Sequence, residues 1–276
     1  MSVFACIIYG FISGIAEFLP ISSRGHQALL RNLVGVDTRI PLQEFLVHIG
    51  VFFSLVVGCA EILNKLHREQ KMLSKHQRKG RHRASSDSYF DLRLLKTATV
   101  PLFIGLFLYF VTAKFENNLL VIMGLWFVNA IFLFIADYMP RGNRNAKTMS
   151  ALDGIVMGFV GVLSVLPGIS RTGAVSSYAI SRGAEEENAA NWSVLLGIPA
   201  LIFAVLFDFT SFVSYGIGVH SFGAILGCIL SGVAAFAGGY LGIALFKLLL
   251  KRSGLSQFAY YSLGAALFSF AIYLIT

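Results

Sequence analysis

Long runs of apolar residues, separated by short polar segments, make up most of this chain. A helix that crosses a bilayer needs about 20 consecutive apolar residues. Six runs reach that length, and they lie at about residues 43–63, 94–113, 118–138, 190–210, 221–246 and 257–275. The pattern therefore predicts an all-α polytopic membrane protein with six spanning helices.

Two further apolar runs are short for a span, and both end in sequences that form turns. Residues 3–19 run into Pro20 and a small polar cluster, and residues 151–166 run into Pro167 and a second such cluster. Each run is a candidate for a re-entrant hairpin, a segment that enters the membrane and turns back inside it.

The composition supports a membrane protein and argues against a soluble one. Charged residues make up only 13% of the chain and hydrophobic residues 56%, whereas a soluble domain carries roughly 25% charged residues. The formal net charge of +8 raises the question of a nucleic-acid partner. Most of the basic residues lie between apolar runs, however, at residues 65–93, 141–147 and 247–252. Cytoplasmic loops have this distribution under the positive-inside rule, so we expect a bilayer and no nucleic acid as the partner.

The same rule predicts a topology. If the basic loop 64–93 is cytoplasmic, the following spans place loop 139–149 and the basic segment 247–252 on the same side, with both termini outside. Residues 3–35 must then enter from outside and return, and residues 150–185 must enter from inside and return. The chain is therefore expected to contain two re-entrant hairpins that approach each other from opposite faces.

The turns of the two hairpins are alike in sequence. The first reads Leu-Pro-Ile-Ser-Ser-Arg-Gly-His over residues 19–26, and the second reads Leu-Pro-Gly-Ile-Ser-Arg-Thr-Gly over residues 166–173. With one residue inserted, Leu-Pro, Ile-Ser, Arg and Gly recur about half a chain apart. Internal similarity with opposite orientation is typical of an inverted-topology repeat, whose site lies near the membrane midplane. We predict that residues 1–276 form a single membrane domain with repeat halves at 1–138 and 139–276.

Four ionisable residues lie in or beside these membrane-depth segments, namely Glu17, Arg24, His26 and Arg171. A charge at the bilayer centre costs about 2.5–3.5 kcal/mol on insertion scales, so such residues face a polar cavity or a partner. They form either a functional site or a structural ion pair, for example Glu17 with Arg171, that joins the hairpins. His48, inside an apolar span, is interpreted as an interior histidine that is hydrogen-bonded within the protein.

Each hairpin turn combines glycine, serine and arginine, which are residues typical of a phosphate site. Glycine lets the backbone approach a ligand, consecutive amides at a helix start bind anions, and arginine binds phosphate through two parallel hydrogen bonds. The predicted phosphate-binding residues are Ser22, Arg24, Gly25, Ser170, Thr172 and Gly173. Two such turns that meet would form a phosphate-binding pocket at membrane depth, which suits a phosphate carried on a lipid.

These turns resemble the two signatures of the undecaprenyl-diphosphate phosphatases, a family also known as bacitracin-resistance proteins. Residues 17–26, Glu-Phe-Leu-Pro-Ile-Ser-Ser-Arg-Gly-His, resemble the first signature, and residues 167–173, Pro-Gly-Ile-Ser-Arg-Thr-Gly, resemble the second. Weaker matches follow each signature at family-like distances, at residues 48–50 and 192–196. The resemblance covers nearly the whole chain.

The resemblance implies a multi-pass enzyme of the bacterial inner membrane that hydrolyses a polyprenyl diphosphate to the monophosphate and inorganic phosphate. It implies a divalent cation, magnesium or calcium, and a homodimer. The reaction recycles the carrier lipid of cell-wall synthesis and confers bacitracin resistance. Carried onto this sequence, the resemblance implies that Glu17 binds the cation and that Ser23 and His26 are the nucleophile and the acid–base group. Ser170 and Arg171 match the family's phosphate-binding pair, with Arg171 among the catalytic residues.

Three positions depart from the family pattern. The family usually has another glutamate one turn before Glu17, where this chain has Ser13, so we expect the cation to be held weakly. A threonine of the first signature is replaced by Arg24, and one of the second by Val175. Arg24 either supplies charge that a cation would give or marks a protein that binds lipid phosphates without cleaving them. The alternative function is therefore a transporter or flippase of a polyprenyl-phosphate lipid.

Overall fold

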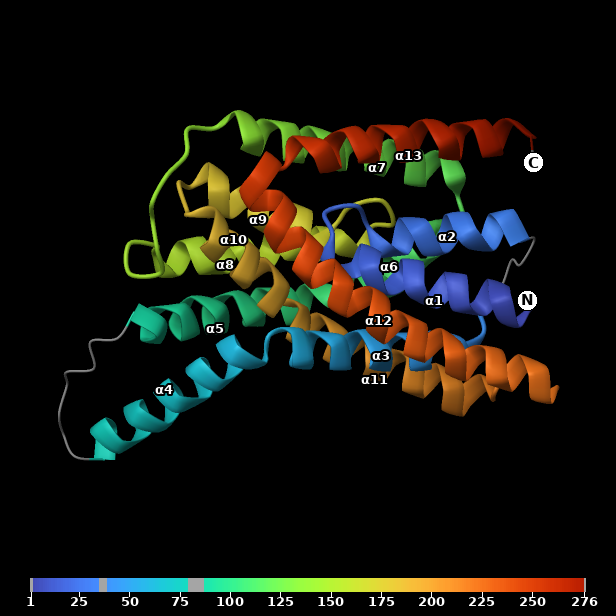
Figure 1. Cartoon of the computed structure of the whole chain (residues 1–276), viewed down its shortest axis with the longest axis horizontal. Coiled ribbons are helices and arrows are strands. Elements are labelled where there is room, and N and C mark those ends of the chain that lie inside the picture. Colours follow the sequence, from blue (N-terminus) through green and yellow to red (C-terminus); the bar gives the residue numbers. More distant parts are fainter. Residues whose placement is uncertain (1, 35–38, 79–86, 276) are drawn as a thin grey trace.

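The computed structural model describes residues 2–34, 39–78 and 87–275, which are almost entirely helical. In Figure 1 most of the helices run roughly along the long axis of the molecule. The α-helices are α1 (Val3–Phe18), α2 (Ser23–Val34), α3 (Pro41–Gly58), α4 (Ala60–Arg78), α5 (Asp87–Leu106), α6 (Tyr109–Thr112), α7 (Leu119–Tyr138), α8 (Ala151–Val162), α9 (Arg171–Ser181), α10 (Glu186–Leu195), α11 (Gly197–Tyr215), α12 (Phe222–Ser253) and α13 (Ser256–Ile275). Two short 3₁₀ helices are η1 (Ala113–Phe115) and η2 (Leu163–Val165). The described residues form no β-strand.

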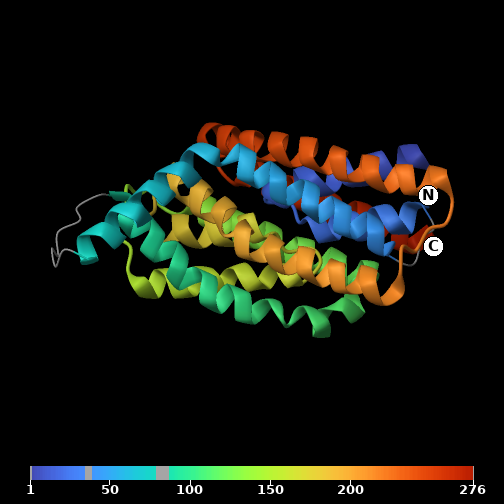
Figure 2. The same cartoon turned by 90° about the horizontal axis from the view of Figure 1, so that it is seen from below.

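Five helical segments in the described part of the chain are long and apolar enough to cross a membrane. They are Pro41–Gly58, Leu119–Tyr138, Glu186–Tyr215, Phe222–Ser253 and Ser256–Ile275. Figure 2 shows several of them running side by side along the molecule. They correspond to five of the six predicted runs, which confirms an all-α polytopic membrane protein.

The sixth predicted run, residues 94–113, is helical but not continuous. α5 ends at Leu106, and α6 begins at Tyr109 after a short turn. Pro101 lies inside α5, and charged side chains in the first half of this helix make it less apolar than the five spans. A membrane crossing by this segment stays a prediction.

The segment predicted as a basic loop, residues 64–93, is largely helical where the structure describes it. α4 continues to Arg78 and α5 begins at Asp87, while residues 79–86 lie outside the described residues. The lysine, arginine, glutamate and glutamine residues of α4 favour a helix, and Leu66 packs against the core. In Figure 1, α4 leads away from the other helices.

Two helical hairpins meet near the middle of the molecule. Figure 1 shows α1–α2 and α8–α9 entering from opposite ends, with their turns close together. The turns are in contact, because the Gly168 amide donates a hydrogen bond to Ser22 Oγ at 3.0 Å. Asn129 of α7 joins both turns, since Nδ2 donates to the Pro20 carbonyl and Oδ1 accepts from the Ser170 amide, each at 3.0 Å. The description of the two halves as an inverted repeat stays a prediction.

Small residues bring α1 and α12 into close contact. A Cβ atom added to Gly10 or Gly14 of α1 would collide with the backbone oxygen of Ser231 or Ala235 of α12. Glycines at such an interface let helix backbones approach closely in a membrane. This packing fixes the position of the first hairpin, whose turn lies near the middle of the molecule.

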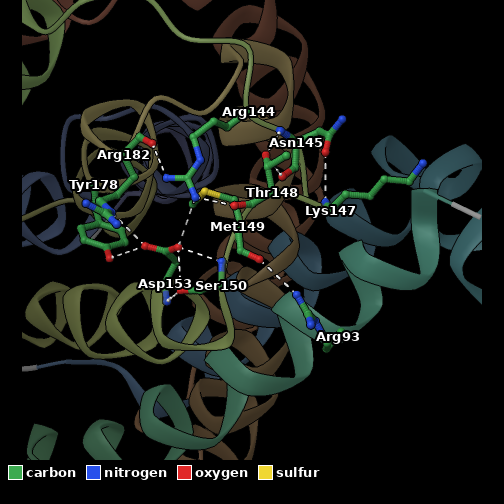
Figure 3. A network of polar contacts seen from close by, with 10 residues as sticks. All are labelled: Arg93, Arg144, Asn145, Lys147, Thr148, Met149, Ser150, Asp153, Tyr178 and Arg182. Carbon is green, nitrogen blue, oxygen red and sulfur yellow. Dashed lines mark hydrogen bonds and ion pairs between the residues drawn. The ribbon is translucent and has the colours of Figure 1, made fainter.

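A polar network holds the open end of the second hairpin (Figure 3). Asp153 and Ser150 form a capping box at the start of α8. Asp153 Oδ1 also accepts hydrogen bonds from the Tyr178 hydroxyl at 3.1 Å and from Arg182 Nε at 2.9 Å. Burial raises the pKa of Asp153, but the hydrogen bonds from these three residues outweigh burial and lower the pKa to about 2. The carboxylate is therefore ionised at neutral pH and ties α8 to α9.

Candidate functional site

A cavity of about 100 Å³ lies where the two hairpin turns meet α3, α6 and α11. Its polar lining consists of Glu17, Ser22, Ser23, Arg24, Gln27, Arg39, His48, Tyr109, Ser164, Ser170, Arg171 and Asp208. Apolar side chains of α11 that line it are Ala200, Leu201, Phe203, Ala204 and Phe207. A charged pocket with an apolar wall suits an anion that is attached to a hydrocarbon chain.

The first hairpin turn depends on a strained serine. Ser22 has a φ of +68°, in the left-handed region where a residue other than glycine costs of order 1–3 kcal/mol. Its Oγ accepts hydrogen bonds from the Gly25 amide at 3.3 Å and from the Gly168 amide at 3.0 Å, which hold this conformation. Gly25 packs so closely on Trp126 that a Cβ atom would lie 2.8 Å from the indole ring. Both residues therefore shape the turn, and only Ser22 lines the cavity.

The second hairpin turn is fastened to the first through hydroxyl groups. Ser170 Oγ accepts from the Gly173 amide at 3.2 Å, which caps α9, and donates to the Leu19 carbonyl at 3.1 Å. Thr172 Oγ1 donates to the same carbonyl at 3.1 Å. Ser170 also lines the cavity, whereas Thr172 and Gly173 do not. The structure thus brings together only part of the predicted phosphate-binding set.

Arg171 and Glu17 form an ion pair that lines the cavity. Arg171 Nη2 lies 3.1 Å from Glu17 Oε1, and Nη1 donates to the Ser193 carbonyl at 2.7 Å. The Arg171 side chain is only 3% exposed, while Glu17 is 19% exposed. Gly197 at the start of α11 makes room for the guanidinium, because a Cβ atom there would lie 2.8 Å from Nη2. The predicted ion pair is therefore present, and it lies in the wall of the cavity.

Two further arginines line the cavity beside this pair. Arg24 donates to the Val165 carbonyl at 2.6 Å, forms an ion pair with Glu116, and lies over the Tyr109 ring at 4.4 Å. Arg39 pairs with the same glutamate at 2.5 Å and donates to the Tyr109 hydroxyl at 2.7 Å. Arg39 was not among the site residues predicted from the sequence. A basic residue on the predicted outer side of the membrane is an exception to the positive-inside rule, and this exception could have identified it.

Ser23 and His26, the predicted catalytic pair, have separate surroundings. Ser23 lines the cavity and donates to the Ser13 carbonyl at 3.0 Å. His26 has Nδ1 at 2.8 Å from the Ser22 carbonyl and Nε2 at 2.8 Å from the Tyr261 hydroxyl. Its ring is buried, stacks on Tyr261, and does not line the cavity. Among the described residues, no hydrogen bond joins Ser23 to His26.

A second histidine does line the cavity. His48 Nδ1 of α3 is hydrogen-bonded to Asp208 Oδ2 of α11, and both residues belong to the cavity wall. His48 is hydrogen-bonded inside the protein, as its interpretation as an interior histidine requires, but that interpretation did not anticipate the cavity. Asp208 was not predicted, although an acid inside an apolar span is itself a functional signal.

Comparison with known proteins identifies the family. The family model of the bacitracin resistance protein BacA matches residues 6–268. The chain belongs to the BacA family.

Curated relatives resemble the chain over most of its length. The undecaprenyl-diphosphatase of Alkaliphilus metalliredigens is 31% identical over 265 residues, which is 95% of this chain and 95% of the relative. That of Carboxydothermus hydrogenoformans is also 31% identical over 265 residues, or 95% of this chain and 94% of the relative. That of Methanobrevibacter smithii is 29% identical over 269 residues, or 95% and 94% of the two chains.

The residues present in this BacA-family site fit a tightly held divalent cation poorly. Glu17 is the predicted ligand, but its Oε1 already accepts a hydrogen bond from Arg171. Ser13, one turn before Glu17, is buried and its Oγ has no hydrogen-bond partner among the described residues. In the described part of the chain, no three histidine, cysteine or acidic side chains come together as a metal site. The protein's own side chains are therefore the groups to which the chemistry is assigned.

Proposed function

We propose that this protein hydrolyses undecaprenyl diphosphate to undecaprenyl monophosphate and inorganic phosphate. In the inner membrane, this reaction recycles the carrier lipid of cell-wall synthesis and thereby gives resistance to bacitracin. The observation that carries the proposal is the cavity between the two hairpin turns, which places Arg24, Arg39 and Arg171 beside an apolar wall. Three guanidinium groups match the charge of a diphosphate, and the apolar side chains match its hydrocarbon chain.

Arg171 binds the diphosphate in this proposal. Its guanidinium is fixed by Glu17 and by the Ser193 carbonyl, and its remaining N–H groups are the donors that we assign to the phosphate. Glu17 acts mainly as a positioning residue for that guanidinium. Ser22 and Ser170 hold the two turns together. These hydrogen bonds keep the backbone amides of the turns and Arg171 in fixed relative positions.

Ser23 is the nucleophile in this proposal. Ser23 lines the cavity, and its hydroxyl is oriented by the Ser13 carbonyl. Attack of Oγ on the distal phosphorus forms a phosphoserine and releases the lipid monophosphate, and water then releases inorganic phosphate. A serine hydroxyl needs a base to take its proton. His26 has both ring nitrogens in hydrogen bonds outside the cavity, so we assign it to positioning the start of α2.

A weakly held divalent cation, magnesium or calcium, with Glu17 as its ligand stays a proposal for this chain. A homodimer likewise stays a proposal.

The proposal is tested by phosphate release from undecaprenyl diphosphate with purified protein in detergent. We expect release by the wild type and loss of at least 100-fold in Ser23→Ala, with Ser253→Ala at the exposed end of α12 as the matched control. Binding of the lipid without phosphate release by the wild type would refute hydrolysis and support the transporter alternative.

A further inference from the structure

We propose that His48 is the acid–base catalyst in this cavity and that Asp208 is its positioning residue. The proposal rests on the hydrolysis proposed above and names a residue for the proton transfers that His26 is not placed to perform.

His48 lines the cavity and has one ring nitrogen in a hydrogen bond. Nδ1 is hydrogen-bonded to Asp208 Oδ2, and Nε2 makes no hydrogen bond to any residue that the structure describes. The His48 side chain is 17% exposed and lines the cavity, while the Asp208 side chain is 5% exposed. The buried carboxylate therefore holds the ring, and Nε2 is the nitrogen that a substrate or a hydroxyl can meet.

Asp208 also decides which nitrogen carries the proton. A carboxylate that accepts a hydrogen bond from Nδ1–H leaves Nε2 as the proton acceptor of the neutral ring and stabilises the imidazolium once it forms. α3 supplies His48 and α11 supplies Asp208, so the pair depends on the packing of these two helices. The same helix pairing brings the apolar wall of α11 to the cavity.

The contrast with His26 supports this assignment. Both His26 nitrogens are in hydrogen bonds, to the Ser22 carbonyl and the Tyr261 hydroxyl. The His26 ring also packs edge-on against Trp126 at 5.2 Å. His26 would have to break a hydrogen bond before it could accept a proton, whereas His48 Nε2 would not.

The proton transfers balance with water as the only other reactant. As Ser23 Oγ bonds to the distal phosphorus, its hydroxyl turns from the Ser13 carbonyl and its proton moves to His48 Nε2. The bond from phosphorus to the bridging oxygen breaks, and its electron pair stays on the lipid phosphate, which takes the proton from Nε2. Water then attacks the phosphoserine and gives a proton to Nε2. Ser23 Oγ leaves phosphorus and recovers that proton.

The charges around His48 include both signs. The carboxylates of Asp208, Glu44 and Glu17 interact electrostatically with the His48 ring. The Arg39 guanidinium interacts electrostatically with Asp208. Removal of the Asp208 charge should therefore alter the pH dependence of turnover while the other groups remain in place.

The experiment compares the wild type with His48→Gln, His48→Ala and Asp208→Asn. His67→Gln, at an exposed position of α4, is the matched control. Phosphate release from undecaprenyl diphosphate gives kcat and KM across pH, and binding of undecaprenyl monophosphate reports on the fold of each variant. General acid–base catalysis contributes about 10²–10⁴-fold. We therefore expect both His48 variants to lose at least about 100-fold in kcat, with KM changed little.

Two further readouts separate catalysis from structure. Added imidazole should restore part of the kcat of His48→Ala, and Asp208→Asn should shift the pH profile of kcat. A His48→Ala protein that binds the lipid and keeps a kcat within threefold of the wild type would overturn the role of His48. No phosphate release by the wild type would instead overturn the proposed hydrolysis itself.

Discussion

Replacing Arg171 by lysine tests whether its guanidinium acts as a clamp that binds the diphosphate. Lysine keeps the positive charge but lacks the planar arrangement of N–H donors. In the structure, Nη2 lies 3.1 Å from Glu17 Oε1 and Nη1 lies 2.7 Å from the Ser193 carbonyl. A guanidinium satisfies both and still presents N–H groups to a phosphate. A lysine ammonium is a compact charge and cannot hold both positions while it binds the substrate.

The magnitude follows from the number of hydrogen bonds lost. A hydrogen bond to a charged group contributes about 1.5–3 kcal/mol. Loss of one phosphate-directed bond in Arg171→Lys predicts a fall in kcat/KM of about 10- to 100-fold. Loss of two in Arg171→Ala predicts a fall of about 100- to 10,000-fold.

The assay is the initial rate of phosphate release from undecaprenyl diphosphate in detergent, with Arg252→Lys at the exposed end of α12 as the matched control. Size-exclusion profiles check the fold, because Arg171→Ala leaves the partly buried Glu17 without its ion-pair partner. A well-folded Arg171→Ala protein with kcat/KM within threefold of the wild type would refute the clamp.

Three further results are expected. Ser13→Glu adds a second carboxylate one turn before Glu17, so phosphate release should become more sensitive to a chelator and respond to lower magnesium than in the wild type; identical cation titrations would contradict this. The hydrogen bonds of Asp153 lower its pKa to about 2, although burial raises it. The ionised carboxylate therefore stabilises the fold by about 2 kcal/mol above pH 4, and this stabilisation is lost as the pH falls from about 4 toward 2. The Tm gap between wild type and Asp153→Asn should therefore shrink over that range, and a constant gap would contradict the assignment. Glu116→Gln removes the carboxylate that pairs with two arginines of the cavity, so inorganic phosphate should inhibit several-fold more strongly, and unchanged inhibition would argue against phosphate binding by those arginines.

The sequence predicts the fold well where the signal is local. Each of the five spans contains a long, largely apolar run, and the hairpin turns are marked by Pro20 and Pro167, where proline removes a backbone donor and favours a turn. The basic connector was less predictable, because charge alone does not distinguish a solvated loop from the helix α4.

The site was predictable in its components but not in its geometry. Ser23 and His26 are three residues apart, which places them on one face of a helix. The direction of the His26 ring, however, is decided by Tyr261, 235 residues away along the chain. Asp208 lies 160 residues from His48, so the pair that lines the cavity could not be recognised from spacing. Long-range side-chain partners set these orientations, and no local pattern encodes them.

Hydrolysis in water enriched in oxygen-18 tests the central claim most directly. Purified wild-type protein and undecaprenyl diphosphate are incubated in this water, and both products are analysed by mass spectrometry. Attack at the distal phosphorus predicts one labelled oxygen in each inorganic phosphate released in a single turnover, and none in undecaprenyl monophosphate. Label in the lipid product, or no phosphate release by folded protein that binds the lipid, would contradict the account.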